Sequence, residues 1–227
     1  MALLGQAALA MWWDVAAGVR AEFEDWHTHE HFPERLSVPG FRRATRWRDA
    51  AGGEGFFVMY ELADHDVLSS PPYLARLNGP TPWSTKMMPH HRNMVRTQCR
   101  VLESRGAAVA REACTVRLSP PDGRAHELRA ALRAFIDDVV ARPGIAGAHL
   151  LQHNAPAIAA TEEQRIRGFG DRAADWILVV VGYDRDVLEG LAARELRGDA
   201  LAAMGAAGEG TCGFYSLSCS ATGADIT

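Results

Sequence analysis

Alternating or unbroken apolar runs divide the chain into short segments that predict β-strands, with helices between them. In the first half the predicted strands cover residues 8–15, 41–48, 56–62 and 93–102, and a helix covers residues 19–31. In the second half the strands cover residues 109–118, 145–153, 176–183 and 213–219, and helices cover residues 127–140 and 187–204. Residues 64–78 predict short helical pieces interrupted by two prolines. The two halves therefore share one order of elements.

Two short motifs recur in both halves and indicate an internal repeat. The sequence Pro-Gly-Phe at Pro39 returns as Pro-Gly-Ile at Pro143, which is 104 residues later. The sequence Asp-His-Asp-Val-Leu at Asp64 returns as Asp-Arg-Asp-Val-Leu at Asp184, which is 120 residues later. The second half thus holds an insertion of 16 residues, and the polar stretch 154–170 can accommodate it.

The repeat and the order of elements predict the fold. A βαββαβ unit carries both helices on one face of an antiparallel sheet, so its other face must be covered. We predict an α+β protein of two tandem ferredoxin-like βαββαβ units, residues 1–105 and 106–227, packed sheet to sheet as a pseudo-dimeric α+β barrel. We expect the functional cavity between the two sheets.

Composition narrows the choice of partner. The chain has 227 residues and a formal net charge of −4, without the basic excess typical of nucleic-acid binding. Its apolar runs fall short of the roughly 20 residues that span a membrane, and its apolar start has no signal-peptide pattern. The four cysteines form no C-x-x-C pair and predict reduced thiols. We therefore expect a cytoplasmic protein with no nucleic-acid or membrane partner; a homodimer is compatible with the repeat but not required by it.

The densest group of polar residues ends the first predicted helix, just before Pro33. On a helical projection, Glu30 lies within the apolar stripe that contains Trp26, and His27 and His31 flank it. Because a residue before proline leaves helical geometry, we expect this helix to stop near His31. Glu30 and His31 are then candidates for a proton-transfer pair. The alternative is a structural role for Glu30, bonded to a backbone amide or to an arginine.

The same segment has a second interpretation as a metal site. His27 and His31 have the i,i+4 spacing that can place two imidazoles on one ion, and His90 with its neighbour His91 could supply a third ligand. The H-E-x-x-H arrangement is absent. We therefore expect no metal as the main case and keep a divalent metal as the alternative.

A loop that leads into the last strand of the first half carries further candidates. It contains Trp83, His90 and Asn93, and polar groups at a strand entrance often contact a ligand. The alternative is a packed loop in which Trp83 fills the core. Arg96 lies on an arginine-bearing face of the following strand, which is either solvated or, if it lines the cavity, binds an anion such as a carboxylate.

Motifs of other enzyme classes are missing. The chain contains no G-x-G-x-x-G, no P-loop and no G-x-S-x-G elbow. Nucleotide-dependent and serine-hydrolase chemistry are therefore disfavoured.

A family resemblance rests on two stretches. Trp26-x-x-x-Glu30-His31-x-Pro33-Glu34-Arg35 with a following Val-Pro-Gly-Phe, and the loop from Pro80 to Met94, resemble the EthD-like branch of the dimeric α+β barrel superfamily. The resemblance covers residues 8 to 104, and the second half lacks a counterpart of the first stretch. It therefore implies one site rather than two. The cavity candidates that it implies are Trp26, Glu30, His31, Trp83, His90 and Asn93.

The superfamily includes cofactor-free monooxygenases, cyclases, isomerases and haem-dependent enzymes, so the resemblance leaves the reaction open. We predict a small-molecule enzyme without a cofactor that performs proton transfer (isomerase, lyase, decarboxylase or cyclase) on an apolar or aromatic substrate that can carry a carboxylate. Glu30 or His31 would act as base, and His90 or Asn93 would polarise an oxygen. The predicted ligand contacts are Trp26, His27, Trp83, Asn93 and Arg96. The alternatives are a monooxygenase, a haem-dependent enzyme with haem held by His27, His31 or His90, and a non-catalytic binding protein.

Overall fold

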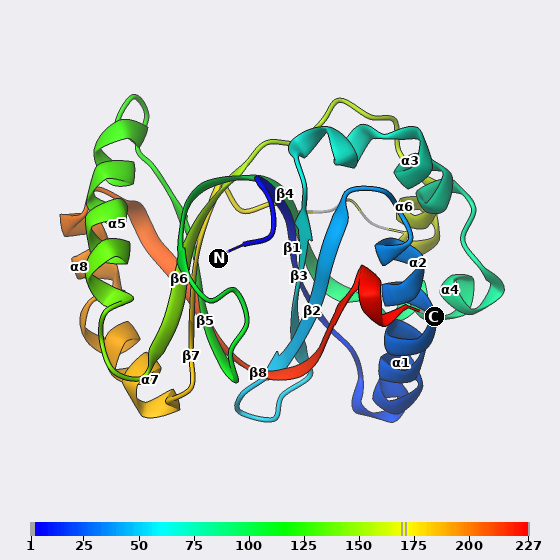
Figure 1. Cartoon of the computed structure of the whole chain (residues 1–227), viewed down its shortest axis with the longest axis horizontal. Helices are drawn as coiled ribbons and strands as arrows, with labels where there is room; N and C mark the ends of the chain where they lie inside the picture. The colour runs from blue at the N-terminus through cyan, green and yellow to red at the C-terminus, as the bar shows by residue number, and fades with distance from the viewer. Residues whose placement is uncertain (1–2, 169, 171, 227) are drawn as a thin grey trace.

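A computed structural model describes residues 3–168, 170 and 172–226, and its described strands close into one barrel (Figure 1). The order around the barrel is β1-β3-β2-β8-β5-β7-β6-β4, with antiparallel pairing between the strands. The strands are β1 (Ala7–Asp14), β2 (Phe41–Asp49), β3 (Gly55–Leu62), β4 (Arg92–Gly106), β5 (Glu112–Ser119), β6 (Ile145–His153), β7 (Trp176–Gly182) and β8 (Ala207–Thr222).

Two long strands join the halves of the barrel. The first part of β4 pairs with β1, and its last part pairs with β6 of the second unit. In the same way β8 pairs first with β5 and then with β2 of the first unit. Each half is thus a four-stranded sheet of ferredoxin-like order, and the fold predicted from the repeat is confirmed.

Helices cover the outer face of each sheet. The first unit has η1 (Ala17–Val19), α1 (Arg20–Trp26), the π-helical turn η2 (His27–His31), α2 (Phe32–Leu36), η3 (His65–Ser69), α3 (Pro71–Asn78), α4 (Pro82–Met87) and η4 (Met88–His90). The second half supplies α5 (Ala125–Val139), α6 (Glu162–Arg167), α7 (Arg185–Arg194), α8 (Gly198–Ala203) and η5 (Gly223–Asp225). In Figure 1, α5, α7 and α8 lie on one side of the barrel, whereas α6 lies on the other side with the first unit's helices. None of the described helices is long and apolar enough to cross a membrane.

The sequence predicted that the first helical segment would stop near His31, but in the structure the segment continues beyond it. It passes through the π turn η2 and continues as α2, with Pro33 in the first turn of α2. A proline in a helix removes one backbone hydrogen bond and crowds the preceding turn, and a π turn provides the wider backbone that accommodates this. The continued helix extends the histidine-bearing face by one further turn.

The space between the two sheets, where we expected the functional cavity, is largely filled by side chains. Aromatic side chains from both strand sets fill the barrel interior, where the Phe57 ring stacks between Trp12 and Trp47 at centroid distances of 5.0 and 5.2 Å. Val179 and Ile177 of the second sheet complete this core. Because this interior is closely packed, the cavity described below lies instead on the outer face of the first sheet.

Candidate functional site

A small buried cavity lies between the first sheet and its helices. Its volume is about 30 Å³, which is room for about one water molecule. Leu9 and Met11 of β1, Met94 of β4, and Leu77 and Met88 from the helices form its apolar walls. Its polar lining consists of His27, His31, Arg35, Tyr60, Tyr73, His91, Arg96, Glu163 and Arg167.

The π turn η2 brings two histidines of this cavity together. The imidazole rings of His27 and His31 stack with a centroid distance of 5.3 Å and an interplanar angle of 23°. The ring of His31 also packs on Trp26 at 4.6 Å. Both histidines are buried, so their charged forms are disfavoured by the loss of water.

Arg46 determines the tautomer of His27. Its Nη1 lies 3.3 Å from His27 Nδ1, and a guanidinium can only donate, so Nδ1 accepts and the proton resides on Nε2. Burial, followed by repulsion from Arg46, His91 and Arg35, lowers the pKa of His27 well below its usual value. His27 is therefore a neutral hydrogen-bond donor at Nε2.

His31 lies between a carboxylate and several cations. Its Nδ1 lies 3.7 Å from Glu34 Oε2, which is too far for a hydrogen bond but close enough to favour the proton at Nδ1 and a lone pair at Nε2. Burial, followed by repulsion from Arg35 and His27, lowers the pKa of His31 well below its usual value. The ring is therefore neutral at pH 7, and its protonated form is disfavoured.

His91, rather than His90, is the third histidine of the cavity. His91 is buried, and its Nδ1 donates to the Met88 carbonyl over 2.9 Å, so that Nε2 carries a lone pair. Among the described residues His90 does not line the cavity; it is half-buried at the end of η4. The alternation of side chains along β4 could not show which of His90 and His91 points into the cavity. The left-handed conformation of Asn93 (φ 54°) interrupts that alternation.

Buried cations surround the histidines. Arg35 forms an ion pair with Glu163 of α6, and its guanidinium lies 5.8 Å from the centre of the Tyr73 ring. Arg96 Nη2 donates to the hydroxyl of Tyr73 over 3.0 Å. The cavity therefore favours anions. The first helix could have indicated Arg35, because it follows His31 by four residues, had the sequence not predicted a stop there.

Glu30 holds helices together in this structure. Its Oε1 accepts hydrogen bonds from Trp26 Nε1 at 3.1 Å, from Ser84 Oγ at 3.3 Å and from Thr81 Oγ1. These contacts fasten α1 to the start of α4. The geometry matches the structural alternative for Glu30, and its catalytic role stays a prediction.

Trp83 and Asn93 lie apart from the buried histidines. Trp83 packs against the edge of the first core. Asn93 is exposed, and its Nδ2 donates to Asp14 Oδ2 over 2.7 Å. Their predicted role as ligand contacts therefore depends on a ligand that extends beyond the cavity.

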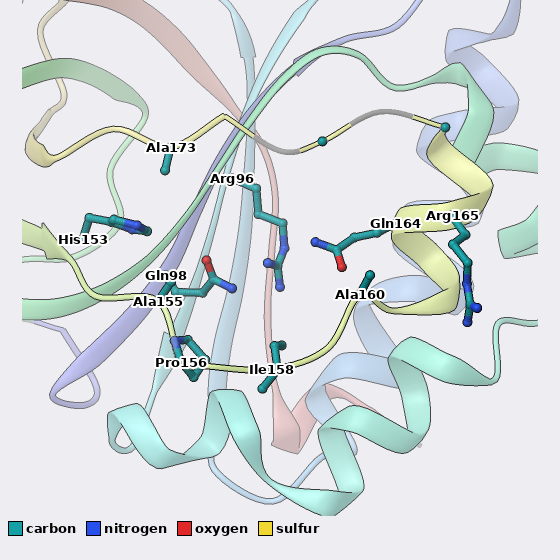
Figure 2. A pocket seen from close by; sticks show the side chains of 12 residues that line it. Arg96, Gln98, His153, Ala155, Pro156, Ile158, Ala160, Gln164, Arg165 and Ala173 are labelled. Carbon is teal, nitrogen blue, oxygen red and sulfur yellow. The ribbon is translucent and has the colours of Figure 1, made fainter.

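A larger cleft opens beside the cavity, between β4 and the segment 153–173 (Figure 2). Its volume of about 680 Å³ is that of an ordinary small-molecule site. Figure 2 shows Arg96 and Gln164 pointing toward each other from opposite walls, with Pro156 and Ile158 below them. Arg96 lines both the cleft and the cavity, so it marks the junction between them.

The fit of a cofactor differs between the two spaces. No group of three or more His, Cys, Asp or Glu side chains is placed to hold a metal ion in the described part of the chain. A haem does not fit beside His27 or His31 in a space of about 30 Å³. The cleft has sufficient volume, and its lining includes His153, whose Nδ1 is buried without a hydrogen-bond partner among the described residues.

Comparisons with known proteins bear on the fold. No protein-family model matches the chain, and no curated protein is similar to it in sequence. Among solved structures, an anthrone oxidase-like protein has a TM-score of 0.64 at 13% identity, covering 100% of this chain and 98% of that one. A proposed monooxygenase from Fusobacterium nucleatum has a TM-score of 0.63 at 10% identity, covering 97% and 96%.

A haem-binding protein from Thermus thermophilus is also similar, with a TM-score of 0.51 at 8% identity and coverage of 96% and 92%. Identities this low establish the architecture alone. The chain therefore has the ferredoxin-like dimeric α+β barrel fold, with both units supplied by one polypeptide.

Proposed function

We propose that this protein is an enzyme that oxygenates a small, planar carbon acid with dioxygen, and that His31 is the general base. The observation that carries the proposal is one buried cavity lined by a neutral imidazole, His31, together with the guanidinium groups of Arg35 and Arg96. The likeness to a proposed monooxygenase and to an anthrone oxidase-like protein supports oxygenation over isomerisation or elimination as the outcome. The resemblance to the EthD-like branch is part of the same proposal.

The reaction begins with proton removal. His31 Nε2 takes a proton from an activated CH₂ group, and the carbanion is stabilised by the nearby guanidinium groups and by the Nε2–H of His27. The electron-rich carbon then reduces dioxygen. Overall R₂CH₂ and O₂ give R₂C=O and H₂O, so one oxygen atom enters the product and the other leaves as water.

The two spaces fit the two reactants. The body of an aromatic substrate suits the cleft of about 680 Å³, with its reacting edge at Arg96. The cavity of about 30 Å³ has room for one molecule of the size of water or dioxygen.

An oxygen electrode tests the proposal. Protein treated with a chelator is mixed with an anthrone, and oxygen uptake is followed together with quinone absorbance. We expect one oxygen consumed for each product formed, and a strong loss of rate in His31→Ala. Product formation without oxygen uptake would instead indicate proton transfer alone, and tight binding without any turnover would indicate a binding protein.

The cleft also favours a second candidate, a haem-dependent enzyme. The buried and unbonded Nδ1 of His153 is the observation that favours it, since within the described chain the other cleft-lining residues offer no imidazole. His153 and the cationic Arg96 and Arg165 are the cleft residues that would hold a haem, which would supply redox chemistry. Haem titration tests this candidate: a stoichiometric Soret band that disappears in His153→Ala supports it, and the same spectrum in both proteins contradicts it.

A further inference from the structure

Glu163 reaches the cavity from the other half of the chain. It belongs to α6, in the insertion that follows β6, and its carboxylate pairs with Arg35 of α2. Both side chains are almost fully buried, with 6% and 3% of their surfaces exposed. The insertion therefore places a negative charge inside the first unit, beside the residues of the proposed reaction.

The pairing leaves donors of Arg35 unused. Glu163 bonds to Nη2, whereas Nη1 has no hydrogen-bond partner among the described residues. The other nearby carboxylate, Glu34, lies 3.7 Å from Nη1, beyond hydrogen-bond distance. A guanidinium favours two parallel bonds to one carboxylate, so this site is built for a better-placed carboxylate than the one that Glu163 provides.

The contacts of α6 allow it to be displaced. Ile166 is the one apolar side chain in Glu162–Arg167, and it packs against the first core. The rest of the helix is charged or polar, and residues 154–161 before it form no regular structure. A segment with so few apolar contacts is held mainly by polar ones, among them the buried pair of Glu163 with Arg35, and it opens more readily once a ligand replaces that pair.

The spaces around Glu163 show what its departure would create. A second small cavity of about 10 Å³ also touches Glu163, and it shares Ile158 and Gln164 with the large cleft. Arg96 lines all three spaces. Movement of α6 would therefore join them into one chamber that extends from solvent to Arg35.

We propose that Arg35 is a binding site for the carboxylate of an aromatic acid, and that Glu163 occupies this site in the absence of the ligand. The ligand's carboxylate replaces that of Glu163, which moves into water with α6. The exchange keeps a carboxylate in hydrogen-bond contact with the buried guanidinium, whereas an uncharged ligand would leave Arg35 with only the more distant Glu34, 3.7 Å from Nη1. The site thus selects acids over amides of the same shape.

The inference depends on the proposed function only in calling the ligand a substrate, and its test measures binding. Benzoate and benzamide are titrated into wild-type protein and Glu163→Ala by calorimetry. We expect Glu163→Ala to bind benzoate about tenfold more tightly, because no internal carboxylate competes, and to gain nothing for benzamide. The matched control is Glu162→Ala, which removes the neighbouring half-exposed carboxylate on the same helix and should bind as wild type.

Two further measurements keep the proposal testable if Glu163→Ala does not fold. The double substitution Arg35→Met with Glu163→Leu removes both charges, a change that buried pairs often tolerate, and it should abolish benzoate binding. In wild-type protein, saturating benzoate should speed amide hydrogen exchange at residues 155–168. Equal benzoate affinity in wild type and Glu163→Ala, equal gains for benzamide, or unchanged exchange in α6 would overturn the proposal. Oxygen uptake could fail while these results held, in which case the site binds acids and the assigned reaction is wrong.

Discussion

The two units share one topology but differ in the layer between sheet and helices. In the second unit α5 packs Leu128, Leu132 and Ile136 against an apolar sheet face. Glu103, in the part of β4 that pairs with β6, is buried at the edge of that layer, where it accepts hydrogen bonds from the half-exposed Arg129 and Arg133 of α5. In the first unit the corresponding layer has histidines and arginines at its centre.

The difference arises from two departures from the regular unit. The first helix contains a π turn that directs His27 and His31 inward, whereas α5 is a regular helix of 15 residues. The insertion of the second half then adds Glu163 and Arg167 to the first unit. Buried ionisable groups reduce stability unless they are paired, so their concentration in one layer is the reason for proposing that the site lies there.

The largest expected effect is a difference in kcat between variants of two buried histidines, one in each unit. His31→Ala should lower kcat by about 10²- to 10⁴-fold, because it removes the proposed base. His149→Ala is the matched control: His149 is saturated by hydrogen bonds to Ser104 Oγ and the Ala107 carbonyl, so its loss should affect stability but not kcat. Steady-state oxygen uptake decides, and an equal loss in both variants would remove the contrast between the units.

The second-largest effect is expected from a substitution in the apolar layer of the second unit. Leu132→Ala should reduce the free energy of unfolding by about 2–5 kcal/mol, because Leu132 is fully buried in the second unit's core. The activity of the folded protein should be unchanged. Urea denaturation measures the stability, and a loss of turnover without a loss of stability would mean that the second layer also serves the reaction.

The buried histidines also predict how stability depends on pH. Their pKa values are lowered in the folded protein, to about 4 for His149, chiefly by burial. Below pH 6.5 these histidines therefore bind more protons in the unfolded chain than in the folded protein. Their contribution to stability is constant above that pH and falls as the pH decreases. The slope is about 1.4 kcal/mol per pH unit for each such histidine. When the free energy of unfolding is measured between pH 4.5 and 7.5, it should depend less steeply on pH in His31→Ala than in the wild type. An unchanged slope would contradict a neutral, buried His31.

Glu30→Gln should have a smaller effect. Glu30 Oε1 accepts bonds from three side chains, so the neutral amide should cost about 1 kcal/mol of stability. We expect kcat to fall by less than about tenfold, whereas loss of a general base costs at least about 10²-fold. A loss as large as that of His31→Ala would restore Glu30 as a catalytic group.

The smallest effect concerns Asn93. Asn93→Gly should change stability by no more than about 0.5 kcal/mol, because glycine favours its left-handed backbone and this gain offsets the lost bond to Asp14. Turnover should also be unchanged. Any strong loss of ligand affinity would show that this strand entrance belongs to the site.

The fold could be predicted from the sequence because the patterns that specify it are local and occur in both halves. Strand alternation and the two recurring motifs were enough to place both ferredoxin-like units. Sequence also placed His27, His31 and Arg96 among its candidates, and all three line the small cavity in the structure. It missed Arg35 because the rule for residues before proline predicted a helix end where a π turn continues the helix.

Other parts of the site depend on tertiary structure. Glu163 and Arg167 reach the cavity only because α6 docks on the opposite unit, and local sequence carries no signal for that docking. The choice between His90 and His91 depended on one backbone angle at Asn93. The location of the cavity depended on how completely aromatic side chains fill the barrel.

The most direct test of the central claim is nitrogen NMR of the histidine side chains during titration with an aromatic acid. Each of the nine histidines can be assigned by single substitution to glutamine. We predict that the imidazole signals of His27, His31 and His91 shift together while His149 does not, and that His27 is protonated at Nε2 and His91 at Nδ1. Unchanged signals for the three, or a shift at His149 instead, would contradict a site in the first unit's buried layer.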